Sequence, residues 1–337
     1  MKIDNYKLVV GNATDVGQVR KFNEDYMAHF GTTYGYCIIV CDGMGGHTAG
    51  DVASQAAIDA IKHYLQDGSM TKFDTATSLL NSIEFANYKL KEMVTLDPSL
   101  SGMGTTCVLA MINGNEMHVA HAGDSRLYLI RKNNIIQVSK DHSTVQMLID
   151  AGALTEEESK YSDKRNQITK AIGIFDKVAP SVTSDPILLN HGDKIVLCSD
   201  GLTSHVETTE IARIIKSFPD VQTAALKLVE KANTAGGTDN ITVQIVEYIG
   251  KSPTVKKVGK ARKTIFLILA AFVIALASYS GYYLVRKSKD DSHPANVQPN
   301  DTASTEKKDT STVPLGNTKL APIPGEKKIT DTTVKKQ

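Results

Sequence analysis

The amino-acid sequence predicts an α+β protein in which packed antiparallel β-sheets carry helices on their outer faces, followed by one transmembrane helix. Several short runs rich in Val, Ile, Leu and Tyr follow one another with only turns between them, which favours antiparallel pairing. Two stretches place apolar residues at helical spacing. A third stretch, near the end of the chain, is uncharged over a length that matches a bilayer.

The strand and helix signals can be placed in chain order. Strands are expected at residues 35–41, 105–112, 116–120, 126–130, 135–139, 193–198 and 240–248. Asn133 and Asn134 predict a hairpin turn. Residues 52–65 and 221–232 predict amphipathic helices, and residues 71–96 predict another that closes at Asp97 and Pro98. The polar, mixed stretch 141–170 predicts a helical excursion or flap on the sheet.

Four segments follow from composition. We expect a folded domain over residues 1–250, a basic linker over 251–263, a transmembrane helix over 264–285 and a disordered tail outside the membrane over 286–337. As a helix, residues 264–285 would span about 33 Å, and they lack the polar face of a buried core helix, which is the alternative. The heavier Lys and Arg cluster precedes this segment, which predicts a single-pass protein of the cell membrane with a cytoplasmic folded domain.

Composition limits the class of function. The chain has 337 residues, 41% hydrophobic and 22% charged, which is ordinary for a globular protein. Its net charge of +1 argues against a nucleic-acid binder driven by overall basicity. The four cysteines lie in apolar runs without a CxxC pair, which predicts reduced, buried thiols and argues against a zinc site: Cys37, Cys41, Cys107 and Cys198.

Acidic residues recur at element ends, and four of them stand beside an expected strand: Glu24, Asp25, Asp42, Asp124, Asp200 and Asp239. Strand ends in a sandwich cluster in space, and converging carboxylates need a proton, a basic partner or a cation. No Lys or Arg stands directly beside Asp42, Asp200 or Asp239 in the sequence, and oxygen-rich ligation suits Mg²⁺ or Mn²⁺. A single Asp-Gly pair would indicate only a turn, but the recurrence of the pattern favours a metal site.

Six ordered motifs resemble those of bacterial PP2C (PPM) metal-dependent protein Ser/Thr phosphatases, over roughly residues 6–249. They are DVGQVRKFNED (15–25), VCDGMGGH (40–47), GTT (104–106), GDSR (123–126), SDGL (199–202) and GTDNITV (237–243). The resemblance implies a central pair of antiparallel sheets flanked by helices. It also implies hydrolysis of phosphoserine and phosphothreonine on proteins by a metal-bridged hydroxide, opposing a membrane Ser/Thr kinase. A catalytically inactive scaffold or sensor of the same fold is the alternative.

The resemblance also assigns roles to individual residues. Two Mn²⁺ or Mg²⁺ ions, with a third as an option, would be held by Asp42, Gly43, Asp200, Asp239, Glu24, Asp25 and Asp124. Asp42 would bridge two ions, Gly43 would contribute its carbonyl, and Asp124 would belong to the third site. Arg20 would bind the substrate phosphate, the alternative being a surface arginine, and Asn240 would orient Asp239 through a hydrogen bond.

One departure from the family pattern concerns the general acid. Met44 stands where eukaryotic members have a histidine, and His47 lies three residues further along. The group that protonates the leaving oxygen is therefore left open between His47 and a metal-bound water.

Overall fold

The computed structural model describes residues 1–45, 49–67, 73–253 and 279. The chain divides into two compact units, Met1–Lys257 and Val258–Gln337, and the fold below is that of the first. Within the described ranges no helix combines the length and apolar character that a bilayer crossing requires. The predicted transmembrane helix, the tail and most of the linker lie outside those ranges, apart from Tyr279, and stay predictions.

Two sheets form the centre of the first unit, and every strand pair in its described residues is antiparallel. One sheet has the order β1-β2-β13-β12-β8-β9. Its strands are Lys2–Ile3, Leu8–Asp15, Ile241–Tyr248, Lys194–Cys198, Arg126–Arg131 and Asn134–Gln137. The other has the order β10-β7-β6-β4-β3, with β11 on β7 and β5 on β4. Its strands are Ser181–Val182, Glu116–Ala122, Cys107–Asn113, Tyr36–Met44, Asp25–Gly31, Ile187–Leu188 and Gly104–Thr105.

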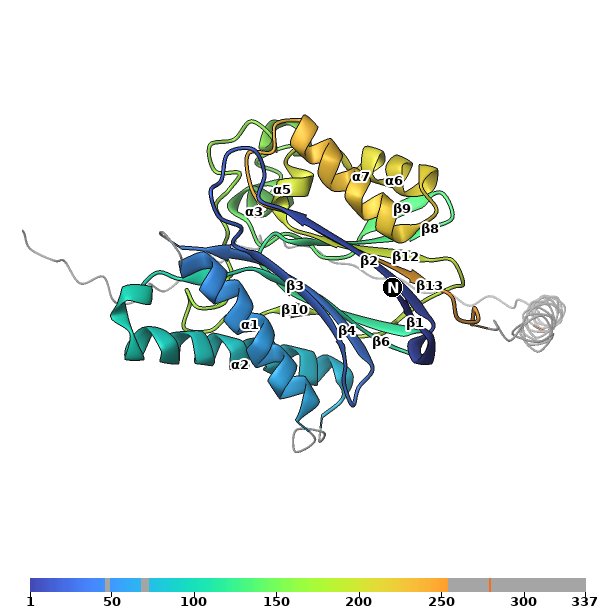
Figure 1. The fold of residues 1–337 in the computed structure, drawn as a ribbon, viewed down its shortest axis with the longest axis horizontal. Coiled ribbons are helices and arrows are strands. Elements are labelled where there is room, and N and C mark those ends of the chain that lie inside the picture. The colour runs from blue at the N-terminus through green and yellow to red at the C-terminus, as the bar shows by residue number, and fades with distance from the viewer. Residues whose placement is uncertain (46–48, 68–72, 254–278, 280–337) are drawn as a thin grey trace, which may run out of the picture. The chain divides into compact units, whose positions relative to one another are not determined.

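Helices cover the outer face of each sheet (Figure 1). The sheet that contains β4 is covered by α1 (Ala49–Gln66) and α2 (Thr75–Leu96), while the sheet that contains β12 is covered by α5 (Asp200–Thr203), α6 (Thr208–Ser217) and α7 (Val221–Thr234). The remaining helices are short: η1 (Asp4–Tyr6), η3 (Pro98–Leu100), α3 (Thr144–Asp150) and α4 (Glu156–Ser159). The predicted sandwich with outer helices is therefore confirmed.

Strand β4 has an unbroken apolar run because both of its faces are buried. Ile38 and Val40 belong to the core between the two sheets, whereas Ile39 and Cys41 pack toward α1 and α2. Because successive side chains point to opposite faces, a strand buried on both sides needs apolar residues at every position. Full burial of each large side chain contributes on the order of 2 kcal/mol. This strand is thus a rigid support for Asp42 at its far end.

The structure corrects and extends several element predictions. The hairpin turn between β8 and β9 falls at Lys132 and Asn133, with Lys132 at φ 56°, because Asn134 is already paired with Arg131. The stretch 141–170 contains the predicted helical excursion as α3 and α4. The sequence patterns did not predict β2, β3 or α6. The four cysteines, all within the described residues, are buried free thiols as predicted.

Candidate active site

The acidic residues at strand ends come from both sheets. Asp25 and Asp42 lie directly opposite each other in the β3–β4 pair. Asp200 follows β12 and Asp239 precedes β13, and because these two strands are antiparallel neighbours, both residues lie at the same end of their sheet. Asp124 lies in the corner between β7 and β8. Each of these five carboxyl groups is buried or half-buried.

The backbone of Asp42 is held by the GTT motif. The Asp42 amide donates to Thr106 Oγ1 at 3.1 Å, and the Asp42 carbonyl accepts from the Thr106 amide and from Thr105 Oγ1, both at 2.9 Å. Thr106 Oγ1 also bonds to Ser125 Oγ of the GDSR motif at 2.7 Å. Three motifs distant in sequence are therefore interlocked. The GTT and GDSR motifs are the only sequence signal for these hydrogen bonds around Asp42. The sequence predicts no role for Thr106 or Ser125.

Gly43 lies where the chain leaves no room for a side chain. Its amide donates to the Glu24 carbonyl at 3.1 Å, and the same carbonyl accepts from Ser54 Oγ at 2.7 Å. A Cβ on Gly43 would overlap the carbonyl oxygens of Gly50 and Glu24. The glycine therefore permits the close approach of β4, the loop before β3 and the start of α1.

Arg20 is carried by the loop of residues 16–24 between β2 and β3. Its Nη2 donates to Asp239 Oδ2 at 2.8 Å, and its Nη1 lies 3.9 Å from Glu24 Oε2. The side chain remains 47% exposed, so a ligand from solvent can reach it. The position predicted to bind phosphate is thus next to two of the predicted metal ligands.

Asn240 fixes this loop with its side chain and makes the predicted hydrogen bond to Asp239 with its backbone. Its Nδ2 donates to the carbonyls of Val16 and Phe22, both at 2.9 Å, and its Oδ1 accepts from the Glu24 amide at 2.8 Å. Asp239 is instead oriented by the Asn240 backbone amide, which donates to Asp239 Oδ1 at 2.9 Å. The backbone makes this bond because three loop backbone groups take the donors and the acceptor of the buried side chain.

Burial and mutual repulsion make these carboxyl groups hard to ionise. Burial raises the pKa of Asp25 to about 7, although Ser199 Oγ donates a 2.7 Å hydrogen bond to it. Burial and the Asp200 charge likewise raise the pKa of Asp124 to about 7. The pKa of Asp42 is well above its usual value because it is buried among other carboxylates. Burial also raises the pKa of Asp200 and Glu24. A divalent cation would relieve this repulsion.

The donor chemistry fits a hard divalent cation. The converging groups are carboxylates, and the buried Asp25 Oδ1 has no hydrogen-bond partner. Among the described residues, however, no three carboxylate, imidazole or thiol groups approach one another closely enough to enclose an ion. The individual ligand roles of Asp42, Gly43, Asp200 and Asp239 therefore stay predictions. His47 lies outside the described residues, and the identity of the general acid stays open.

Burial of these carboxyl groups, together with their mutual repulsion, gives the metal-free protein an unusual pH dependence. The pKa of Asp25 and of Asp124 is about 7 when folded, against about 3.9 for an unfolded chain. Between about pH 4 and pH 7 the folded state binds more protons, so the free energy of unfolding falls as pH rises, by up to about 1.4 kcal/mol per pH unit for each group. We expect the Tm of EDTA-treated protein to fall between pH 5 and pH 7.5.

Two comparisons check this expectation. Mn²⁺ added at pH 7.5 should restore the Tm, because a bound cation favours the ionised carboxylates. Asp25→Asn should flatten the metal-free profile, because one of the titrating groups is removed. A Tm that rises over the same range in the metal-free protein would mean that burial does not raise the pKa of Asp25 and Asp124.

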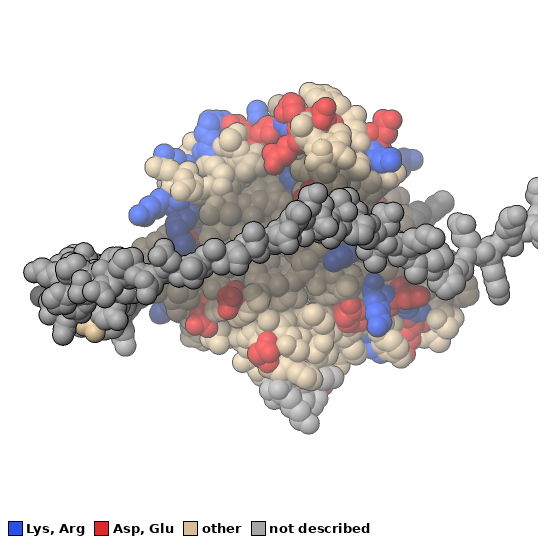
Figure 2. Space-filling model, turned by 180° about the vertical axis from the view of Figure 1, so that it is seen from behind, with Lys and Arg blue, Asp and Glu red and all other residues tan. Residues whose placement is uncertain are grey.

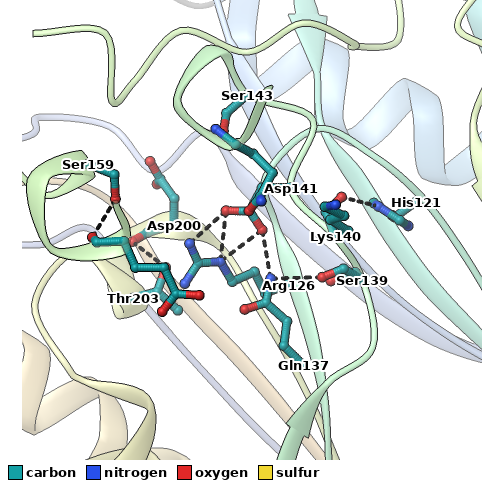
Figure 3. Close-up of polar contacts among 12 residues, drawn as sticks. His121, Arg126, Gln137, Ser139, Lys140, Asp141, Ser143, Ser159, Asp200 and Thr203 are labelled. Carbon is teal, nitrogen blue, oxygen red and sulfur yellow. Dashed lines mark hydrogen bonds and ion pairs between the residues drawn. The ribbon is translucent and has the colours of Figure 1, made fainter. Parts of the chain in front are cut away.

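Arg126 of the GDSR motif connects the site to the flap (Figure 3). Its Nη2 donates to Asp141 Oδ2 at 2.6 Å, its Nε reaches both Asp141 oxygens at 3.0 Å, and its Nη1 donates to the Tyr128 hydroxyl at 3.2 Å. The Asp141 side chain is only 9% exposed. The next residue, His142, donates its amide to the Gly123 carbonyl at 2.9 Å, beside Asp124. The flap therefore begins at a fixed point next to the carboxylate cluster.

Breaking this buried ion pair should destabilise the fold. Arg126→Met would leave the Asp141 carboxylate without its cation, and we expect a loss of about 3–5 kcal/mol in the free energy of unfolding, measured by urea denaturation. Arg213→Met, which removes an exposed ion pair with Glu210, is the matched control and should leave the denaturation midpoint unchanged. Equal midpoints for the two variants would mean that the buried pair does not hold the flap.

Comparisons with known proteins agree with this architecture. A sequence profile described as "Protein phosphatase 2C" matches residues 23–147. Protein phosphatase PhpP of Streptococcus pneumoniae is 39% identical over 238 residues, covering 69% of this chain and 94% of that protein. The S. agalactiae serine/threonine phosphatase structure has a TM-score of 0.66 at 36% identity, covering 71% of this chain and 99% of that one. The catalytic domain of the phosphatase PstP, solved in complex with two manganese ions, has a TM-score of 0.63 at 34% identity, covering 71% and 97%.

Proposed function

The chain belongs to the PP2C family of protein serine/threonine phosphatases, and we propose that the carboxylate cluster around Asp42 is its active site. The reaction is hydrolysis of phosphoserine and phosphothreonine on proteins. The observation that carries the site assignment is the gathering of Asp25, Asp42, Asp200 and Asp239 at one end of the two sheets, with Arg20 beside them.

The enzyme depends on Mn²⁺ or Mg²⁺, in keeping with the two manganese ions in the PstP complex. When bound, the ions supply an activated water and offset negative charge on the phosphoryl group. We assign Asp42, the Gly43 carbonyl, Asp200 and Asp239 as direct ligands, with Glu24 and Asp25 acting through water. Asp124 would serve a third site. All of these groups present oxygen atoms, which is what hard divalent ions prefer.

Arg20 would bind the phosphate of the substrate. Its planar guanidinium can donate two parallel hydrogen bonds to phosphate oxygens. The loop that carries it is tied down by the side chain of Asn240, so the guanidinium is positioned before the substrate arrives. Its present bond to Asp239 keeps it beside the carboxylates without burying it.

Hydrolysis of p-nitrophenyl phosphate and of a phosphothreonine peptide tests this function. We expect turnover of both by the full chain with Mn²⁺, and none after EDTA treatment. Absence of turnover at saturating Mn²⁺ would favour the alternative, a catalytically inactive scaffold or sensor.

We further propose that the phosphatase is a single-pass protein of the cell membrane whose catalytic domain lies in the cytoplasm and opposes a membrane Ser/Thr kinase. The support is the uncharged stretch 264–285 with the basic cluster before it. Protease added outside intact cells should trim the tail after residue 286 and spare residues 1–250; the reverse pattern would invert the topology.

A further inference from the structure

Two large apolar side chains lie exposed on either side of Arg20. Val19 is 65% exposed and Phe22 is 61% exposed. Both belong to the loop of residues 16–24 that carries the proposed phosphate-binding guanidinium. Single exposed apolar residues are common on protein surfaces, but an aromatic and a branched residue within two positions of a phosphate-binding arginine form a local feature that needs a physical reason.

The loop is held too firmly to bury these side chains by moving. Besides the bonds from Asn240, the Gln18 amide donates to the Gly237 carbonyl at 2.7 Å, and Asn23 Nδ2 donates to Thr14 Oγ1 at 2.8 Å. The carbonyl of Phe22 itself accepts from Asn240 Nδ2. The backbone beneath both side chains is therefore ordered in the free protein, so a ligand that covers them pays little ordering entropy.

We propose that Val19 and Phe22 form an apolar rim that contacts the substrate residues beside the phosphorylated one, and so selects phosphoprotein segments with apolar side chains there. The inference rests on the proposed role of Arg20. A phosphate bound at Arg20 fixes the phosphoresidue, and an extended peptide advances about 3.3 Å per residue, so positions one or two away lie within reach of the rim. The occupant is the substrate polypeptide itself.

Two phosphothreonine peptides test the proposal. They are identical except that the two positions on each side of the phosphothreonine are leucine in one and glutamine in the other. With the full chain and Mn²⁺, we expect kcat/KM to be about tenfold higher for the leucine peptide, chiefly through a lower KM, because contacts outside the reacting centre act on binding.

Surface variants locate the effect. Phe22→Ser and Val19→Ser should each reduce the ratio of kcat/KM for the leucine peptide to that for p-nitrophenyl phosphate, with the glutamine peptide affected least. The matched control is Leu226→Ser, which removes a 54% exposed side chain on α7 and should keep wild-type values for every substrate.

The possible failures are distinguishable. Equal kcat/KM for the two peptides, or unchanged ratios in both rim variants, would overturn the rim while leaving the phosphatase assignment intact. No turnover of either peptide or of p-nitrophenyl phosphate by the wild type would instead reject the proposed function, and the rim with it. If the rim variants lose activity equally toward both peptides and p-nitrophenyl phosphate, Val19 and Phe22 position Arg20 and do not select the substrate. That result also overturns selection by the rim.

Discussion

Asp42→Ala is expected to lower kcat/KM by at least about a thousandfold, for p-nitrophenyl phosphate and for a phosphothreonine peptide alike, at saturating Mn²⁺. Asp42 follows the fully buried run 36–41 of β4 and lies opposite Asp25, with its backbone bonded to Thr105 and Thr106. No neighbouring side chain can take its place, because the strand that carries it cannot shift without disturbing the core on both sides.

The loss should be chemical and not structural. Removing a buried carboxylate among others relieves repulsion, so the metal-free Asp42→Ala protein should melt no lower than the metal-free wild type at pH 7.5. Asp59→Ala, on the exposed face of α1, is the matched control and should retain wild-type turnover. Near-wild-type rates for Asp42→Ala would remove the assignment of this cluster as the catalytic centre.

Gly43→Ala is expected to reduce turnover by at least about a hundredfold without removing any charged group. The added methyl would overlap backbone carbonyls of Gly50 and Glu24, and backbone cannot rotate away as a flexible side chain can. The strand end, the loop before β3 and the start of α1 must then separate. Displacements of about 1 Å at a catalytic site commonly cost a hundredfold in rate.

A second glycine serves as the control for this substitution. Gly114 has a positive φ of 62° in the β6–β7 turn, but a Cβ there meets nothing within 4 Å. Gly114→Ala therefore tests conformational strain alone, which costs on the order of 1 kcal/mol, and turnover should be retained. Similar loss of activity in both variants would mean that Gly43 matters for folding and not for the geometry of the site.

The strand predictions succeeded for the continuous apolar runs of β4 and β12, and they missed β2 and β3, whose sequences lack such a run. Strand β2 contains Gly11, Asn12, Thr14 and Asp15, which resemble a loop in sequence. Its pairing with β13 over eight residues supplies the stability that local composition lacks. Strand β3, which begins with Asp25 and contains His29, was missed for a related reason: its pairing with β4, and not its own composition, makes it a strand.

Asp42, Asp124, Asp200 and Asp239 were recognisable from sequence because each stands next to a strand signal or a glycine, whereas Glu24 and Asp25 stand next to neither. The contacts that support these carboxylates were not recognisable. The resemblance predicts a hydrogen bond from Asn240 to Asp239, which the Asn240 backbone amide makes, but nothing in the sequence indicates that its side chain bonds to backbone groups of residues 16, 22 and 24. The Arg126–Asp141 pair spans 15 positions and depends on how the flap folds back on the sheet. No local pattern encodes such pairings, because they depend on the tertiary register.

Charged side chains of both signs are mixed on the surface face in Figure 2. On the face in Figure 2, basic and acidic side chains occur together on both the upper and the lower part, in keeping with a net charge of +1. This face therefore presents no broad field of one sign.

Anomalous diffraction from crystals of this protein grown with Mn²⁺ is the most direct test of the central claim, that carboxylates from both sheets hold divalent cations. We predict two manganese peaks about 3.5–4 Å apart that share Asp42, with Asp200 and Asp239 completing one of the shells. Manganese peaks elsewhere on the domain, with the Asp42 and Asp239 side chains turned away from any ion, would contradict it.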